Sequence, residues 1–195
     1  MKKLKIIKST MLPLNMSNVD TDQIMPKQFL KRVERSGYGE YLFHDWKKDP
    51  DFPLNNGLYK GAKVLVAGDN FGTGSSREHA PWGLQDWGFE AIISTKFADI
   101  FRLNSINIGL VPIETNKENV EALFSKIDTD SETIIQISIE DKTVVCGDIS
   151  FSFSLDDFSQ KRIIEGLDKI DITLGYLDQI ENFSQSRKRW KPTLV

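Results

Sequence analysis

The chain has 195 residues, a formal net charge of −3 at pH 7, 39% hydrophobic residues and 27% charged residues. This composition is typical of an ordinary soluble globular protein and gives no general reason to expect binding to nucleic acid or to an anionic membrane. A single cysteine, Cys146, excludes an internal disulfide framework and favours a reducing, cytoplasmic location, and no apolar run approaches the ~20 residues that span a bilayer.

The first predicted element is an edge strand over residues 4–14, with Pro13 at its end. A polar, turn-forming stretch follows, in which Asp20 and Asp22 flank Thr21. Two carboxylates at this spacing could share a metal ion or hold an arginine. Alternatively, they belong to a solvated loop that caps the next helix.

The segment after this loop, residues 26–33, has two interpretations. One is a helix that buries Phe29, Leu30 and Val33 at helical spacing. The other is a segment that presents Phe29 and Leu30 to a ligand. Residues 34–60 then predict a short helix and a long loop rich in aromatic residues, in which His44 is expected to be structural.

A glycine-rich loop, residues 68–79, lies between an apolar stretch at 62–67 and a helical stretch at 80–88. The order of strand, turn and helix aims free backbone N–H groups at the turn, and the helix dipole adds to their attraction for an anion. The loop carries three glycines, which permit positive φ and close approach of a ligand to the backbone: Gly68, Gly72 and Gly74.

The loop lacks the lysine of a P-loop and the third glycine of a dinucleotide-binding turn. It carries instead two hydroxyls, a guanidinium, a carboxylate and an imidazole, on Ser75, Ser76, Arg77, Glu78 and His79. Arg77 could clamp a carboxylate through two parallel hydrogen bonds, and either serine could donate to an oxyanion or act as a base. The alternative is a capping box between Ser75 and Glu78, which would not explain the arginine and the glycines.

Beyond this loop, apolar strands alternate with helical patterns, which predicts an α/β core with parallel strands. These expected elements are residues 89–95, 98–107, 109–113 and 116–127. Short β segments with tight turns follow and predict antiparallel hairpins. They cover residues 133–140, 142–147 and 149–155.

Two further helices are expected, residues 156–165 and a tail helix over 172–183. The basic stretch 187–191 could contact nucleic acid, but basic chain ends are more often solvated or contact a partner. Without repeats or a low-complexity linker, we predict a single domain over 1–195, with a C-terminal helical tail from about residue 172.

Four stretches together resemble the aconitase-type swivel domain family and, more narrowly, the small subunits of 3-isopropylmalate dehydratases. Residues 74–82 resemble the family signature, and residues 18–30, 97–105 and 166–170 follow in the family's order. The resemblance covers roughly residues 4 to 180. It implies an α/β fold, the swivelling β/β/α three-layer domain of the aconitase type.

The resemblance also implies roles for individual residues. Ser75 would be the catalytic base, acting as an alkoxide, and Asp22 would lie in the pocket and orient catalytic groups. Ser76 and Arg77 would bind a carboxylate of the dicarboxylate substrate. The family's activity is the dehydration and rehydration of 2-isopropylmalate and 3-isopropylmalate in leucine biosynthesis.

The remaining implications concern specificity. In the family, the segment with Phe29 and Leu30 reads the substituent of the substrate, and these apolar side chains would suit an isopropyl group. A second interpretation of the function is a related hydro-lyase for homoaconitate or a citrate-like substrate. Lys31 and Arg32 could then meet the extra carboxylate of that substrate. A third is a non-enzymatic anion-binding module that kept the fold.

The reaction needs a Lewis acid, which in this family is a [4Fe–4S] cluster. Such a cluster needs about three or four thiolates, and this chain has one cysteine and two histidines. We therefore expect no cofactor in this chain, a cluster on a separate large subunit as partner, and no activity for this chain alone.

Overall fold

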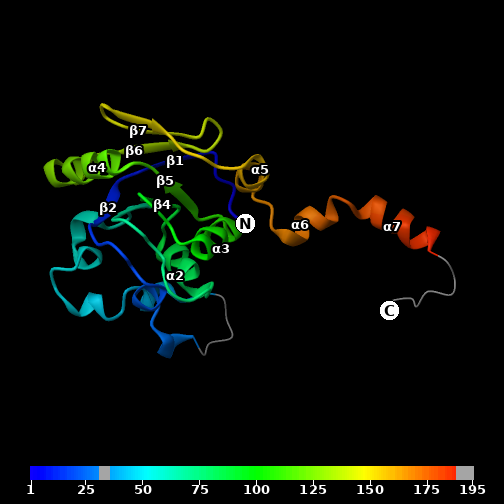
Figure 1. Ribbon diagram of the computed structural model, residues 1–195, viewed down its shortest axis with the longest axis horizontal. Coiled ribbons are helices and arrows are strands. Elements are labelled where there is room, and N and C mark those ends of the chain that lie inside the picture. The colour runs from blue at the N-terminus through cyan, green and yellow to red at the C-terminus, as the bar shows by residue number, and fades with distance from the viewer. Residues whose placement is uncertain (31–35, 188–195) are drawn as a thin grey trace.

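The computed structural model describes residues 1–30 and 36–187, which form two sheets flanked by helices (Figure 1). The strands are β1 (Ile6–Ser9), β2 (Met11–Leu14), β3 (Val64–Ala67), β4 (Ala91–Ser94), β5 (Val111–Glu114), β6 (Ile135–Ser138), β7 (Thr143–Cys146) and β8 (Ile149–Ser152). The α-helices are α1 (Thr21–Ile24), α2 (His79–Trp87), α3 (Asp99–Ile108), α4 (Lys117–Thr129), α5 (Asp157–Glu165), α6 (Lys169–Leu174) and α7 (Leu177–Ser186).

The central sheet has the strand order β2-β3-β4-β5, and all its strands are parallel. Strand β3 is buried along its whole length because it is covered on both faces. Its side chains alternate, so that Val64 and Val66 join one apolar core and Leu65 and Ala67 join the other. The predicted parallel α/β core is therefore present.

The second sheet has the order β1-β6-β7-β8 and is antiparallel, as the hairpin pattern predicts. Its inner face shares a core with the central sheet, to which Ile7, Ile137 and Val144 contribute together with Val120 and Leu123 of α4. The second core lies on the other face of the central sheet, against the side of α1, α2 and α3. The layers are thus sheet, sheet and helices, in agreement with the expected β/β/α order.

The prediction of one strand over residues 4–14 is wrong. The chain leaves β1 at Ser9 and enters β2 at Met11, and these strands lie at the edges of different sheets. Pro13 lies within β2, opposite Val66, which is permitted because β2 has a free edge. This short segment therefore joins the two sheets.

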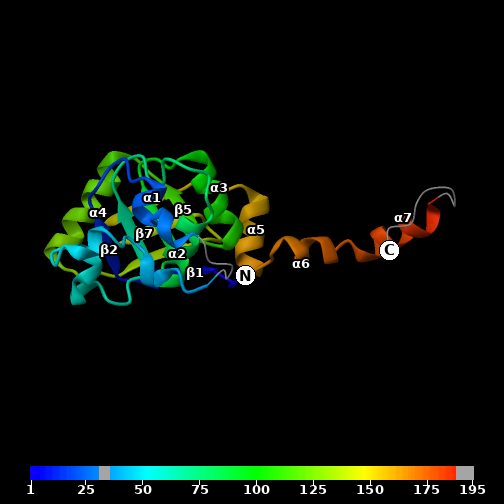
Figure 2. The same cartoon turned by 90° about the horizontal axis from the view of Figure 1, so that it is seen from below.

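The predicted helix 172–183 is also wrong, since α6 ends at Leu174, α7 begins at Leu177 and Gly175 lies between them. Together α6 and α7 extend away from the sheets (Figures 1 and 2). Among the described residues no helix is long and apolar enough to cross a membrane. The expectations for Lys31, Arg32, Val33 and residues 188–191 fall outside the described part of the chain.

Candidate functional site

The candidate site is built by two segments that leave neighbouring parallel strands at the same edge of the central sheet. Residues 15–21 follow β2 and residues 68–75 follow β3, and the two run side by side through the backbone bridge of Asp20 with Thr73. The Thr21 N–H donates to the Thr73 carbonyl at 2.8 Å. This edge, at the carboxyl ends of the strands, is where open α/β sheets usually bind their ligands.

The loop after β3 can follow this path only because of its glycines. Gly72 and Gly74 have φ of +80° and +92°, values that residues with a side chain rarely adopt. A Cβ atom on Gly72 would overlap the ring of Phe101, and one on Gly74 would overlap the carboxylate of Asp20. Gly68 does not have the positive φ expected of it, and its role is a close approach to the backbone of residue 16.

The two carboxylates near Thr21 have different partners. Asp20 is the N-cap of α1 and accepts from the Asp22 N–H at 2.6 Å, while the Gln23 side chain accepts from the Asp20 N–H at 2.7 Å. Asp22 points away from the cap. One of its oxygens accepts a hydrogen bond from a terminal nitrogen of Arg77, and the other lies 3.1 Å from the Lys27 ammonium.

Arg77 is thus held by Asp22, 55 positions away in the sequence. Both side chains are about one-third exposed, so the pair lies at the surface of the site and not in the core. Among the described contacts, this bond uses only one terminal nitrogen of the guanidinium. The arginine fork therefore still has N–H donors for a carboxylate.

Ser75 is positioned by Thr21, which is 3% exposed. The Ser75 N–H donates to the Thr21 hydroxyl oxygen at 3.1 Å, and the two hydroxyl oxygens are 3.3 Å apart. The alternative of a Ser75–Glu78 capping box is wrong, because α2 begins at His79 and its N-cap, Glu78, makes no side-chain cap hydrogen bond. Ser75 lies ahead of the helix, in a connection held against α1.

Ser76 is exposed, and its carbonyl accepts a hydrogen bond from the Asn104 side chain at 3.2 Å. Helix α3 therefore also supports the loop. Sequence reasoning assigned no role to Asn104. The only signal was its place in the stretch 97–105, because a hydrogen bond across 28 positions cannot be read from spacing.

His79 begins α2 and packs its ring against those of Tyr38 and Trp82, with centroid distances of 5.3 and 4.7 Å. Its Nδ1 atom is buried and has no hydrogen-bond partner among the described residues. Burial lowers the pKa of this imidazole, the positive charge of Arg77 lowers it further, and Glu78 opposes both. The structure therefore favours the neutral imidazole beside Arg77.

Phe29 and Leu30 are half-buried at the margin of the helical core. Phe29 stacks on Tyr41 at a centroid distance of 4.2 Å and meets the edge of His44 at 4.9 Å, so His44 has a packing contact as expected. The described part of the predicted helix is a short 3-10 turn, Lys27–Phe29. The ion pair of Lys27 with Asp22 connects this segment to the carboxylate that holds the arginine.

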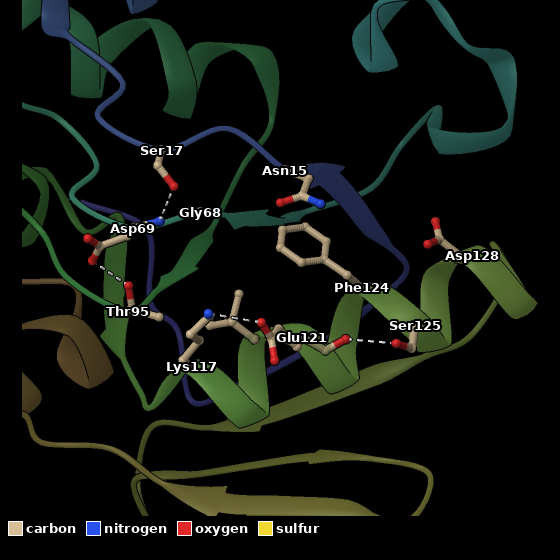
Figure 3. Close-up of a pocket in the computed structure, with 11 residues that line it drawn as sticks. Asn15, Ser17, Gly68, Asp69, Thr95, Lys117, Glu121, Phe124, Ser125 and Asp128 are labelled. Atoms are coloured by element: carbon tan, nitrogen blue, oxygen red, sulfur yellow. Dashed lines mark hydrogen bonds and ion pairs between the residues drawn. The ribbon is translucent and has the colours of Figure 1, made fainter.

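A cavity of about 760 Å³ lies at the start of the two loops, between the strand ends and α4 (Figure 3). Its lining includes the carboxylates of Asp69, Glu121 and Asp128 and one ammonium, that of Lys117, which lies 3.4 Å from Glu121. An excess of carboxylates does not suit an anionic ligand. The chemistry of Ser75 and Arg77 lies further along the same loops.

Known proteins resemble this chain along most of its length. The family model described as Aconitase C-terminal domain matches residues 1–118. The 3-isopropylmalate dehydratase small subunit of Micrococcus luteus is 47% identical over 184 residues, which is 94% of this chain and 92% of that protein. The protein of the same name from Rubrobacter xylanophilus is 44% identical over 195 residues, the whole of both chains.

The chain belongs to the family of 3-isopropylmalate dehydratase small subunits. A crystal structure titled 3-isopropylmalate dehydratase, from Methanocaldococcus jannaschii, matches with a TM-score of 0.67 at 27% identity. The match covers 91% of this chain and 99% of that one. The resemblance and the aconitase-type fold are thereby confirmed.

An iron–sulfur cluster is held by about three or four cysteine thiolates. In residues 1–30 and 36–187, no group of three or more His, Cys, Asp or Glu side chains is arranged to hold a metal ion. Cys146 is buried in the core between the two sheets, and burial raises the pKa of its thiol. The described residues of this chain do not fit such a cluster.

Proposed function

We propose that this chain is the small subunit of a 3-isopropylmalate dehydratase, which interconverts 2-isopropylmalate and 3-isopropylmalate in leucine biosynthesis. The observation that carries the proposal is the identity of 44% and 47% to small subunits of that name over 92% or more of both chains. The partner is the large subunit, and we expect the complex in the cytoplasm, without nucleic acid or membrane. The chain alone should be inactive.

The reaction removes a proton and a hydroxyl group from adjacent carbons to give an unsaturated diacid and water, and then adds water back in the opposite sense. The proton lies next to a carboxylate and is barely acidic, and hydroxide is a poor leaving group. A strong base, a cation for the substrate carboxylate and a Lewis acid are therefore needed. The Lewis acid, a [4Fe–4S] cluster, is assigned to the large subunit.

Ser75 takes the role of the base. Its hydroxyl oxygen lies 3.3 Å from that of Thr21, and a hydrogen bond donated by the Thr21 hydroxyl would stabilise negative charge on the Ser75 oxygen. The guanidinium of Arg77, two residues on, adds positive charge to the same loop. Ser75 would accept the proton from one carbon and return it to the other during rehydration.

Arg77 binds a substrate carboxylate, and the Ser76 hydroxyl is the second donor. The Asp22 carboxylate supports this role because it fixes one terminal nitrogen of Arg77. A bidentate contact needs a guanidinium plane with a fixed direction, which a single anchored nitrogen helps to provide. Asp22 therefore acts by positioning the arginine.

Phe29 and Leu30 are assigned to the substituent of the substrate. Apolar contacts with an isopropyl group supply only about 1–3 kcal/mol of discrimination, but a carboxylate placed there would be desolvated without a partner. The stacking of Phe29 on Tyr41 gives this segment a fixed position. We therefore expect a preference for isopropylmalate over homoaconitate and citrate.

Purification with the large subunit tests the function directly. We expect kcat/KM for 2-isopropylmalate to exceed the values for homoaconitate and citrate by at least tenfold. Leu30→Arg should weaken isopropylmalate turnover. Equal kcat/KM values for isopropylmalate and homoaconitate would overturn the substrate assignment and favour a related hydro-lyase.

A further inference from the structure

Helices α6 and α7 form an arm with an apolar face that the described chain does not cover. Every residue from 173 to 186 is exposed. The large apolar side chains of α7 and its N-cap are between 42% and 66% exposed, and they are Tyr176, Leu177, Ile180 and Phe183. Three of them, at positions 176, 180 and 183, follow the i, i+4, i+7 spacing of one helix face.

A helix of this length needs a surface to pack against. Isolated helices shorter than about 12–15 residues are marginal in water, and α7 has 10 residues. Polar residues such as Asp178, Gln179 and Glu181 occupy other positions of the helix, so α7 is amphipathic. Leaving its apolar face in water is unfavourable. Both facts indicate that the arm is stabilised by a partner.

The arm is continuous with the edge of the candidate site through α5 and α3, which lie side by side in both views (Figures 1 and 2). Arg162 of α5 donates to the Asn107 side chain of α3 at 3.2 Å, and its guanidinium lies 5.7 Å from the ring of Phe158, which is exposed. A groove of about 440 Å³ between α5 and α6 runs from Phe158 to Tyr176.

The other end of this surface reaches the catalytic loop. Ile100 and Leu103 are more than half exposed on α3, and the next residue, Asn104, binds the Ser76 carbonyl. Exposed apolar side chains therefore extend from the loop of Ser75, along α3 and α5, to the end of α7. We name this surface the apolar band, made up of Ile100, Leu103, Phe158, Tyr176, Leu177, Ile180 and Phe183.

We propose that the apolar band is the docking surface for the large subunit, and that the α6–α7 arm extends along that subunit away from the active site. This inference rests on the proposed function. The large subunit has to approach Ser75 and Arg77 to complete the site, so it covers Ile100 and Leu103 beside them. The continuity of the band with that contact assigns the arm to the same partner and not to a second copy of this chain.

The arm then contributes to affinity and takes no part in the chemistry. Once the large subunit is held at the site, contacts along the arm are intramolecular and slow dissociation of the complex. Substitutions on the arm should weaken assembly, and turnover should return when the large subunit is supplied in excess. Substitution of Ser75 should instead reduce turnover without weakening assembly, and an excess of the large subunit should not restore turnover.

The test is the dissociation constant between the full-length chain and the purified large subunit, measured by titration calorimetry. The double variant Ile180→Glu with Phe183→Glu should raise the dissociation constant at least tenfold. Val145→Glu is the matched control, because Val145 is 42% exposed, like Ile180, but lies on β7 in the antiparallel sheet. It should leave the constant within twofold of wild type, and thermal unfolding should confirm that both variants fold.

Two results would overturn the proposal. One is a dissociation constant for the double variant within twofold of wild type. The other is concentration-dependent dimerisation of the isolated chain that the double variant abolishes while binding of the large subunit is unchanged, since the occupant would then be a second copy. A wild-type complex that forms but does not turn over isopropylmalate would count against the proposed function instead.

Discussion

At the scale of single residues, the main feature of the site is the ion pair of Arg77 with Asp22. Their ion pair joins α1 to the connection between β3 and α2, and it fixes one terminal nitrogen of the arginine. Sequence spacing identified Ser75, Ser76 and Arg77 as a cluster because they are consecutive. For Asp22, an arginine was only one of several possible partners. The actual contact depends on the pairing of two strands far apart in the chain, which spacing does not reveal.

The first prediction concerns the fork of Arg77. Arg77→Lys keeps the positive charge but loses the planar set of donors, so KM for isopropylmalate should rise and kcat should fall together. Asp22→Asn should produce a weaker version of the same change, since it removes only the anchor. Steady-state kinetics of the assembled enzyme measure both. Wild-type kinetics for Arg77→Lys would mean that Arg77 has a structural partner only.

The second prediction uses the lowered pKa of His79. An unfolded histidine titrates near pH 6.5, and the folded protein holds His79 neutral to lower pH. Below about pH 6.5 the unfolded state therefore binds the proton first, and the contribution of this group to stability falls as the pH falls. Above that pH the group adds no pH dependence.

Urea unfolding at pH 8 and at pH 5.5 gives the measurement for His79. His79→Gln should reduce the loss of unfolding free energy between these two pH values. An unchanged loss in the variant would show that the imidazole has the same pKa in the folded protein as in the unfolded chain, and a larger loss would show that its pKa is raised on folding.

The third prediction concerns Cys146, which is fully buried and whose thiol pKa is raised by burial. The reactive species of cysteine is the thiolate, so the native protein should resist iodoacetamide at pH 8. After denaturation, mass spectrometry should find a single alkylated thiol. Rapid alkylation of the native chain would contradict the packing between the two sheets.

At the scale of elements, hydrophobic periodicity predicted the buried strands and the amphipathic helices well. Each of these elements stays within one layer of the fold, so its apolar pattern matches its secondary structure. It failed at residues 4–14 and 172–183, for physical reasons that differ. In the first segment the apolar pattern continues while the chain passes from one sheet to the other at Thr10. In the second, Gly175 interrupts the helix, and no described packing against the sheets constrains that arm.

The fourth prediction separates backbone strain from steric contact in the catalytic loop. Gly61 and Gly74 both have positive φ, but a Cβ on Gly61 has no atom within 4 Å, while one on Gly74 overlaps the Asp20 carboxylate. Gly61→Ala should therefore cost only the strain, ~1–3 kcal/mol in unfolding free energy. Gly74→Ala should cost more and should also reduce turnover, because Asp20 caps the helix that carries Asp22.

Chemical denaturation of the two glycine variants, with activity of the assembled enzyme, distinguishes these effects. Equal losses of stability, with full activity for Gly74→Ala, would mean that Asp20 can move without disturbing Asp22.

At the scale of the whole molecule, the central sheet brings the carboxyl ends of β2 and β3 together, and α1 and α3 both hold the glycine-rich loop. The family resemblance gave the layer order, but residue patterns alone could not say which strands form which sheet. The single domain over residues 1–195 stays a prediction. In the proposed function, this chain supplies one part of an active site that the large subunit completes.

The most direct test of this account is turnover of Ser75→Ala in complex with the large subunit. Loss of a general base typically costs two to four orders of magnitude in rate, so kcat should fall at least a hundredfold while the dissociation constant of the complex stays within twofold of wild type. Ser150→Ala, an exposed serine on β8, is the control and should keep full activity. Turnover of Ser75→Ala within tenfold of wild type would contradict the account.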